Sequence, residues 1–428
     1  MTDRAPAGPR HVPPRRAAAP ALCLPLLLLL LAFGGCSTIL RLDPPPAAAT
    51  ESLPVLGIPN ARFWPDGPAD ALLQEGIQMV ARRTAAAPGA PLPDAHFLAL
   101  SGGGDNGAFG AGLMVGWTAS GTRPVFDVVT GISAGALIAP FAFLGPAYDP
   151  QLREVFTAVE LRDVLRVGSH VSTVFAAVFG EALADASPLY QLIERHADAA
   201  MLAAIAREYA RGRLLLIGTT NLDVQRPVIW NIGAIAASGH PDALRLFRRI
   251  LLASASIPGA FPPVLVDVDY AGRAHQEMHV DGGAATQVFL FPPSLYLRAV
   301  TQDRPTARRR VVYVVRNGRI DVEWSSTVRG LFSIASRSLA TLLHFSGLND
   351  IGRIYLTSTR DGVEFRLASI GPDFTDQRSG PFDRAFMQAL FAHGERRGAA
   401  GEAGWADAPP AVTILDLPAA PAGARVVR

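Results

Sequence analysis

The sequence predicts an α/β fold in which a mainly parallel central sheet is covered by helices on both faces. Its 428 residues are 49% hydrophobic and 18% charged, a composition typical of a globular protein. From residue 96 onward, short apolar runs alternate with segments of helical periodicity. Strands that are apolar throughout are typical of parallel sheets buried on both sides.

The first 36 residues are predicted to be a lipoprotein-type signal peptide. Arginines precede an apolar run at residues 21–33, which is shorter than the roughly 20 residues that a membrane-spanning helix needs. Small residues then lead to Cys36 and resemble the motif at which bacterial lipoproteins are cleaved and lipidated. We therefore expect a lipid-anchored membrane lipoprotein of the bacterial cell envelope that faces the periplasm. The alternative is an uncleaved anchor, or an ordinary signal peptide with an incidental cysteine.

The segments that flank the predicted core are less regular. Residues 37–94 are rich in proline and alanine and are expected to form a tether and N-terminal extension, with one helix at 69–83. Residues 301–428 are expected to form a C-terminal extension that packs on the core and ends in a flexible tail. Within that extension we expect a helix at 327–343 and a hairpin at 354–367.

The regular core is expected at residues 95–300. Its predicted strands are residues 97–100, 125–130, 214–218, 228–230, 264–268 and 278–280, with one more strand at 311–315. Its predicted helices are a segment that ends at residue 117 and residues 136–144 and 242–255.

Composition excludes several kinds of chemistry. All 39 basic residues are arginine, so a Walker phosphate loop, a lysine Schiff base and a serine–lysine dyad are ruled out. Both cysteines, Cys23 and Cys36, precede the core, which therefore has no disulfide, thiol nucleophile or cysteine-ligated zinc. The 37 acidic residues leave a net charge of +2, which creates no field that would recruit nucleic acid.

The segment Gly131-Ile132-Ser133-Ala134-Gly135 places one hydroxyl between two glycines, where a strand is expected to run into a helix. A serine becomes nucleophilic when its hydroxyl is exposed and a nearby base removes the proton. A sharp strand-to-helix turn exposes the hydroxyl, and the glycines permit strand and helix to approach closely. Ser133 is therefore the candidate nucleophile.

Three glycines, Gly102, Gly103 and Gly104, follow the first core strand and are candidates for an oxyanion hole. Their unshielded amides suit an oxygen that becomes negative in the transition state. The rival interpretation is a dinucleotide site, because Gly102, Gly104 and Gly107 also match G-x-G-x-x-G. Its ribose-binding acid belongs at the end of the second strand, whereas Asp127 opens that strand.

The sequence motifs leave open which side chain would act as the base that activates Ser133. Histidine is the usual base, but His279 and His344 fit structural or surface positions better than a catalytic loop. Asp281 ends a strand and is followed by Gly282 and Gly283, a turn able to direct its carboxylate over the sheet edge. Partial burial would raise the pKa of such a carboxyl enough for it to act as a base. An ordinary Asp-Gly turn is the structural alternative.

Taken together, these motifs resemble the patatin-like phospholipases over residues 96–295. Three matches are the glycine loop at 102–107, the serine elbow at 131–135 and the acidic turn at 281–283. A fourth is the proline-rich block at 253–263. The resemblance implies a three-layer α/β/α fold and hydrolysis of lipid acyl esters by a Ser133–Asp281 dyad, without a metal or organic cofactor. One departure is Asn106, where many family members carry arginine or lysine.

The expected partner is a membrane lipid or another long-chain ester, and no nucleic acid is expected. A catalytically silent lipid-binding or scaffolding lipoprotein is the alternative function. The segment 164–180 has apolar residues at helical spacing and is either a lid that lines an acyl groove or ordinary core.

Overall fold

The computed structural model describes residues 41–167, 184–300 and 308–410. Contacts divide the chain into two units, Met1–Arg41 and Leu42–Arg428, and every described helix and strand belongs to the second. The predicted signal peptide, Cys36 and most of the segment 164–180 lie outside the described residues. In the part that is described, every helix is too short or too polar to span a lipid bilayer.

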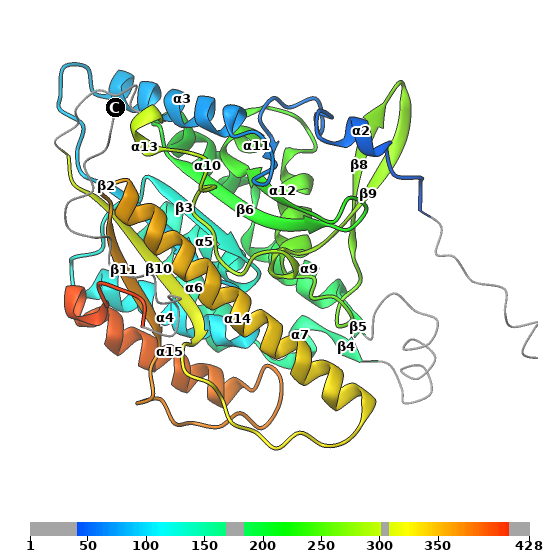
Figure 1. The fold of residues 1–428 in the computed structure, drawn as a ribbon, viewed down its shortest axis with the longest axis vertical. Helices are drawn as coiled ribbons and strands as arrows, with labels where there is room; N and C mark the ends of the chain where they lie inside the picture. Colours follow the sequence, from blue (N-terminus) through cyan, green and yellow to red (C-terminus); the bar gives the residue numbers. More distant parts are fainter. Residues whose placement is uncertain (1–40, 168–183, 301–307, 411–428) are drawn as a thin grey trace, which may run out of the picture. The chain divides into compact units, whose positions relative to one another are not determined.

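A mixed, mostly parallel sheet forms the centre of this unit (Figure 1). In spatial order its strands are β1 (Arg62–Phe63), β7 (Arg226–Asn231), β6 (Leu214–Asn221), β3 (Val128–Ile132), β2 (Ala95–Leu100), β10 (Arg310–Arg319) and β11 (Glu364–Ile370). The pairs from β6 through β3, β2 and β10 to β11 are parallel. The hairpin of β8 (Val264–Tyr270) and β9 (Arg273–Asp281) joins β6 in antiparallel fashion. A separate two-stranded sheet pairs β4 (Arg166–Val167) with β5 (Ala184–Asp185).

Helices cover both faces of the sheet, so the expected three-layer α/β/α fold is confirmed. The longer helices are α3 (Asp70–Ala86), α4 (Gly107–Ala119), α5 (Ala134–Leu144), α6 (Asp149–Thr157), α9 (Ser187–His196), α10 (Ala199–Ala210), α12 (Ala243–Ser254), α14 (Leu331–Arg360) and α15 (Arg384–Ala399). The short ones are α2 (Ala47–Thr50), α7 (Leu161–Val164), α11 (Ile232–Ala237) and α13 (Leu297–Val300).

Two apolar cores lie on opposite faces of the sheet, and strand β2 shows why. Leu98 and Leu100 face the core that contains α4, α5 and α15, whereas Phe97 and Ala99 face the core beneath α3 and α14. Alternate residues of a strand point to opposite faces, and in β2 both sets are apolar. The continuous apolar run in the sequence therefore reflects burial on both sides.

The expected hairpin at 354–367 is wrong. Helix α14 continues to Arg360, and β11 pairs in parallel with β10. Leu348, Ile351 and Ile354 pack into the core under α14, and their spacing of three residues is that of a helix. A parallel pair needs a long crossover, which α14 supplies (Figure 1). Strands β10 and β11 thus lie inside the main sheet, although they come from the segment expected to be an extension.

Candidate active site

Ser133 occupies a strained turn between β3 and α5. Its backbone angles are φ 55° and ψ −124°, in a region that residues other than glycine rarely adopt. The two flanking glycines permit this turn. A Cβ on Gly131 would lie 2.5 Å from the carbonyl oxygen of Gly135, and one on Gly135 would lie 2.3 Å from that of Leu100. The structure therefore has the sharp elbow that the sequence predicted.

Ser254, at the end of α12, stabilises the turn at Ser133 through two hydrogen bonds of its side chain. Its hydroxyl accepts a 3.0 Å hydrogen bond from the backbone N–H of Ser133 and donates one of 2.6 Å to the carbonyl of Gly218. Sequence reasoning included Ser254 only as part of the proline-rich block. Its contact with Ser133 depends on how α12 packs, which no local pattern shows.

Asp281 lies at the end of β9, opposite Thr219 of β6. One carboxylate oxygen, Oδ1, accepts a 2.7 Å hydrogen bond from the amide of Gly283, in the tight turn formed by Gly282 and Gly283. The other oxygen, Oδ2, is buried and has no hydrogen-bond partner in the described part of the chain. Burial raises the pKa of Asp281 to about 7, although the hydroxyl of Ser133 and the amide of Gly283 act to lower it.

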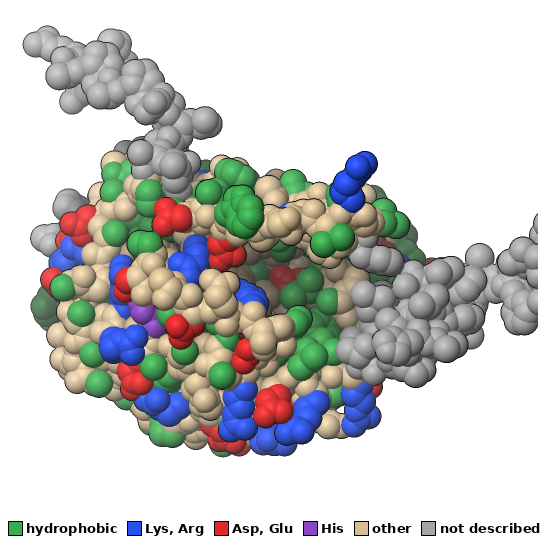
Figure 2. Space-filling view, turned by 90° about the horizontal axis from the view of Figure 1, so that it is seen from below, with side chains coloured by type: hydrophobic (Ala, Val, Ile, Leu, Met, Phe, Trp, Pro, Cys, Tyr) green, Lys and Arg blue, Asp and Glu red, His purple; other side chains and the backbone are tan. Residues whose placement is uncertain are grey.

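Ser133 and Asp281 line the same cavity, whose volume is about 520 Å³. The hydroxyl of Ser133 lies near enough to affect the pKa of Asp281, but no hydrogen bond of normal geometry joins the two side chains. Such bonds between catalytic groups are often long in the absence of substrate. Seen from below, the molecule is hollowed, and hydrophobic, basic and acidic side chains lie around the hollow (Figure 2).

The glycine loop forms another wall of this cavity. The amide of Gly102 donates a 3.0 Å hydrogen bond to the carbonyl of Gln287. Within the described residues, the amides of Gly103 and Gly104 make no hydrogen bond and are available to a ligand. Gly103 has to be glycine because a Cβ there would lie 2.1 Å from the carbonyl oxygen of Asn317.

Arg378, from the segment between β11 and α15, contacts the glycine loop. Its guanidinium donates hydrogen bonds of 2.9 Å to Asp105 and 3.0 Å to Asn106, and it lines the cavity. The loop therefore has a neighbouring cation although position 106 is not basic. Sequence reasoning missed Arg378 because 272 positions separate it from Asn106.

Asp127, the acid that a dinucleotide site would require, lies elsewhere. It precedes β3, at the amino end of the parallel strands, and forms an ion pair of 2.7 Å with Arg83. The glycine loop follows the carboxyl end of β2. These ends lie at opposite edges of a parallel sheet, so Asp127 does not face the glycine loop.

The two histidines considered as bases differ in their surroundings. His344, on α14, lines the cavity, and burial and the charge of Arg316 lower its pKa. His279 is fully buried, with hydrogen bonds to Thr219 and Glu277. The contacts of His279 agree with the expectation that this residue is structural. His344 shares a cavity with Ser133 and Asp281, which its sequence context did not indicate.

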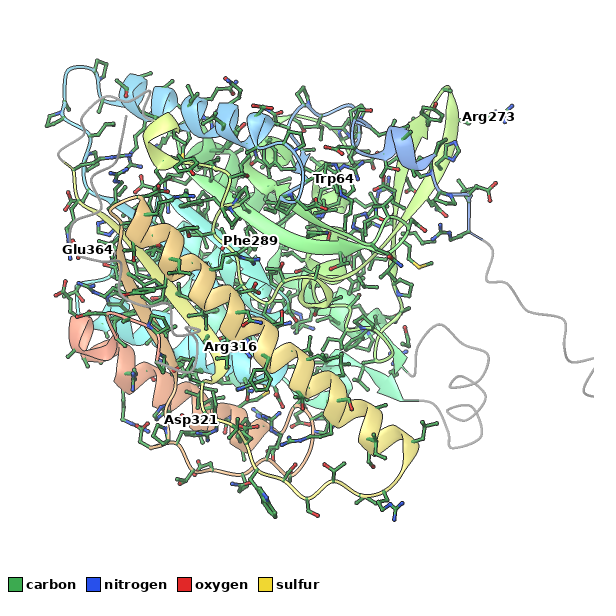
Figure 3. The ribbon with its side chains drawn as sticks, in the orientation of Figure 1. Trp64, Arg273, Phe289, Arg316, Asp321 and Glu364 are labelled. Atoms are coloured by element: carbon green, nitrogen blue, oxygen red, sulfur yellow. The ribbon has the colours of Figure 1, made fainter. Side chains whose placement is uncertain are left out.

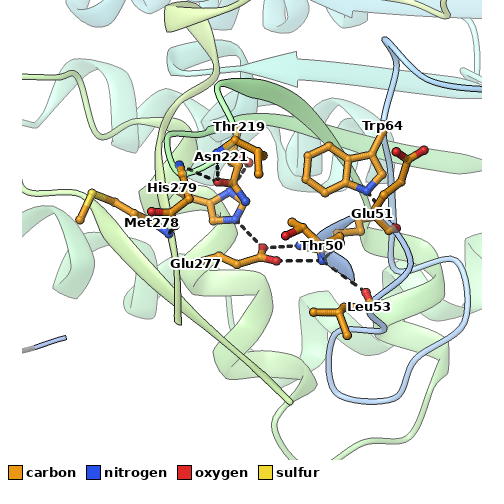
Figure 4. Close-up of polar contacts among 12 residues, drawn as sticks. Thr50, Glu51, Leu53, Trp64, Thr219, Asn221, Glu277, Met278 and His279 are labelled. Atoms are coloured by element: carbon orange, nitrogen blue, oxygen red, sulfur yellow. Dashed lines mark hydrogen bonds and ion pairs between the residues drawn. The ribbon is translucent and has the colours of Figure 1, made fainter. Parts of the chain in front are cut away.

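His279 belongs to a buried network that joins the N-terminal segment to β9 (Figure 4). Arg62 forms an ion pair with Glu277 and donates a 3.0 Å hydrogen bond to the carbonyl of Thr50. Glu277, His279 and Asp281 alternate along β9 and so lie on one face of the strand. The network therefore fixes the strand that carries Asp281.

A smaller apolar pocket meets this cavity at Ser133 and Gly104. Its wall includes Leu137, Val155, Phe156, Leu189, Leu192 and Phe261. The nucleophile candidate thus has an apolar pocket on one side and, on the other, the larger cavity, whose wall also carries polar and charged side chains. Among the described residues, no cluster of histidine, cysteine or carboxylate side chains is arranged to bind a metal.

A serine elbow and a glycine loop at the carboxyl ends of parallel strands, together with a buried carboxyl that lines the same cavity, define a hydrolase-type site. Residues 98–291 match the family described as patatin-like phospholipase, and these residues contain all four motifs identified in the sequence. Over this segment the chain is similar to the patatin-like phospholipases, a family of carboxylic ester hydrolases.

The solved structures similar to this chain include the two that follow. The crystal structure of VipD from Legionella pneumophila has 11% identity and a TM-score of 0.34, with 73% of this chain and 67% of that chain covered. Human GIVD cytosolic phospholipase A2 has 12% identity and a TM-score of 0.29, with 73% of this chain and 55% of that chain covered. The chain thus spans little more than half of the human protein. A comparison with curated proteins gave no match.

Proposed function

We propose that this protein is a serine acyl hydrolase that cleaves carboxylic esters of lipids, as a phospholipase A or lipid esterase. The observation that carries the proposal is the pairing of a strained, positioned Ser133 with the buried carboxyl of Asp281 in one cavity. A carboxyl whose pKa is about 7 is a far better base at neutral pH than an exposed aspartate.

The reaction follows from these positions. Oγ of Ser133 attacks the ester carbonyl while Oδ2 of Asp281 takes the hydroxyl proton. The amides of Gly103 and Gly104, in a loop that Gly102 fixes through Gln287, donate to the negative oxygen of the tetrahedral intermediate. Asp281 returns the proton to the leaving alcohol, which forms an acyl-enzyme on Ser133. Asp281 then takes a proton from the water that attacks the acyl group, and it returns this proton to Oγ of Ser133 as the C–O bond breaks and the fatty acid is released.

The apolar pocket beside Ser133 suits the acyl chain of the substrate. Its lining consists almost entirely of carbon-rich side chains, and it reaches both the nucleophile and Gly104. An acyl chain placed there would leave the rest of the lipid in the larger cavity. Burial of each methylene stabilises the bound chain by about 0.8 kcal/mol.

We also propose that the protein works on a lipid surface in the bacterial cell envelope. The cavity has an exposed apolar rim: Val322, which lines the cavity, is 78% exposed, and Trp324 and Leu331, which follow it in the chain, are 89% and 80% exposed. Ile334, Leu342 and Phe345 continue this surface along α14, and Phe345 also lines the cavity. Exposed apolar patches that adjoin a lipid site are typical of membrane contact. Attachment through the predicted lipid anchor at Cys36 would hold this rim near its substrate.

The rival function is a lipid-binding lipoprotein without turnover, and a fluorophosphonate probe separates the two. Such probes react quickly only with an activated serine. We expect covalent labelling of Ser133 in the full chain and none in Ser133→Ala, with the labelled residue identified by peptide mass spectrometry. A wild-type protein that remains unlabelled would support the rival function.

A further inference from the structure

Arg316 differs from the other basic side chains on the wall of the catalytic cavity. Four arginines line this cavity, and three of them, Arg319, Arg337 and Arg378, donate hydrogen bonds to protein oxygens. In the described part of the chain, Arg316 has neither a hydrogen bond nor an ion pair. It is nevertheless only 6% exposed. A buried guanidinium without an acceptor is unusual because its desolvation is not compensated.

The position of Arg316 follows from the strand that carries it. The next residue, Asn317, directs its side chain toward α4, where its Oδ1 accepts a 3.1 Å hydrogen bond from the amide of Gly110. Alternation along β10 therefore places Arg316 on the opposite face, beneath α14 (Figure 3). Gly347 of α14 makes room for it, since a Cβ there would lie 2.7 Å from Nη1 of Arg316.

The nearest acidic group does not satisfy Arg316. Asp350 affects the pKa of Arg316, but its Oδ2 accepts from the amides of Gln287 and Val288, and its Oδ1 accepts from Arg353. Burial lowers the pKa of Arg316, yet a guanidinium remains cationic at neutral pH. The cavity thus contains a fixed positive charge whose N–H groups donate to no oxygen of the described residues.

We propose that Arg316 binds the phosphate group of a glycerolipid substrate. This inference rests on the proposed function, because it assumes that Ser133 attacks a lipid ester. The planar guanidinium donates two parallel hydrogen bonds to a phosphate, which no neutral headgroup can accept in the same way. With the acyl chain in the apolar pocket, the phosphate lies on the other side of Ser133, in the cavity that Arg316 lines. Arg316 is then a residue that determines substrate specificity.

The test compares two soluble short-chain lipids that differ only in the headgroup, dihexanoyl phosphatidate and dihexanoylglycerol. We expect the wild-type protein to have the higher kcat/KM on the phosphatidate. Arg316→Gln is expected to reduce that preference at least tenfold, mainly through KM. Arg316→Lys, which keeps the charge but loses the fork of donors, is expected to lie between the two. Inorganic phosphate is expected to inhibit the wild type competitively and to show whether free phosphate binds the same subsite.

Arg310→Gln is the matched control, because Arg310 begins the same strand and does not line the cavity. It is expected to keep the wild-type preference. Equal losses on both lipids in Arg316→Gln, or no preference in the wild type, would overturn the proposal. If Arg316→Gln does not fold, Arg316→Lys serves as the test. A preference for phosphatidate in Arg316→Lys as large as that of the wild type would contradict the proposal. Failure of the proposed function is a separate result, in which the wild type cleaves neither lipid.

Discussion

The backbone N–H of Ser133 donates its hydrogen bond to the hydroxyl of Ser254, 121 positions further along the chain. This contact ties the strained elbow to the end of α12, and through Ser254 to the carbonyl of Gly218 on β6. A positive φ costs free energy at a non-glycine residue and persists only where its surroundings fix it. Ser254 is the side chain that fixes Ser133.

Replacement of Ser254 by alanine should loosen the elbow. The variant leaves the buried N–H of Ser133 and the carbonyl of Gly218 without this partner, which costs about 1 to 3 kcal/mol of unfolding free energy. We expect kcat to fall roughly tenfold as the hydroxyl of Ser133 loses its fixed direction. Ser256→Ala is the control, since the hydroxyl of Ser256 donates to the carbonyl of Leu252 in the last turn of α12 and does not contact the elbow. Equal effects of both variants on kcat would contradict a role for Ser254 in the elbow.

Loss of either member of the proposed dyad should abolish turnover. Ser133→Ala and Asp281→Asn are each expected to reduce the release of fatty acid from short-chain esters by about 10³-fold or more. The matched control is Asp269→Asn, which replaces an exposed aspartate on the neighbouring strand β8. His344→Ala is expected to retain turnover. Activity that survives in Asp281→Asn and disappears in His344→Ala would assign the base to the histidine of the cavity wall.

The pKa of Asp281 predicts opposite pH dependences for activity and stability. As a base, Asp281 has to be ionised, so kcat/KM should rise with pH through about 7. The folded protein holds this proton up to pH about 7, whereas the unfolded chain releases it near the ordinary value of 3.8. The free energy of unfolding therefore falls as pH rises from about 4 to 7, by up to about 4 kcal/mol.

Asp281→Asn removes this titration. The variant should unfold at a higher temperature than the wild type at pH 8, and the difference should shrink toward pH 4. Thermal unfolding followed by circular dichroism at both pH values measures it. A wild-type protein whose stability does not depend on Asp281 in this range would show that the carboxyl does not hold a proton in the folded state at neutral pH.

The buried pair of Arg62 and Glu277 should matter more than an exposed pair of the same kind. Burial raises the pKa of Glu277, but hydrogen bonds from His279 and Arg62 outweigh it and lower the pKa to about 2. Its stabilising contribution is therefore complete above the ordinary value of 4.5 and is lost as pH falls toward 2. Glu277→Gln leaves Arg62 without its charge partner and should cost about 3 to 5 kcal/mol at pH 7.

The control for that pair is Glu364→Gln at the exposed bidentate pair with Arg309. Such a pair contributes about 0 to 1 kcal/mol. Urea unfolding at pH 7 and pH 3 measures both variants. If Glu277→Gln and Glu364→Gln lowered the free energy of unfolding equally, the buried pair would not stabilise the protein more than the exposed pair.

The apolar rim of the cavity should be needed for lipid surfaces and not for soluble esters. Trp324→Ala together with Leu331→Ser should weaken binding to phospholipid vesicles at least several-fold in a co-sedimentation assay and leave turnover of a soluble short-chain ester unchanged. Val125→Ser is the control, because Val125 is also exposed but precedes β3 at the amino edge of the sheet. If the rim variant instead changes the oligomeric state, the surface contacts a second copy of the chain.

Much of the core and the contiguous parts of the site were predictable from the sequence. Some features depend only on the local backbone, and the structure shows each of them. They are the apolar strands, the glycines at 131 and 135 and the turn after Asp281. The prediction of a hairpin at 354–367 failed because a short apolar run fits a strand and a helix equally well. Only the packing of α14 on the sheet decides between them.

By itself, the sequence determined the kinds of groups present: one hydroxyl at a glycine-flanked turn, one carboxyl at a strand end and a loop of bare amides. Tertiary structure alone decided which of these groups meet, how deeply Asp281 is buried, and that Ser254, Arg378 and Arg316 stand beside them. The physical reason is that turns and strands depend on neighbouring residues, whereas burial, pKa and contact depend on chain segments that are distant in sequence and are brought together by packing.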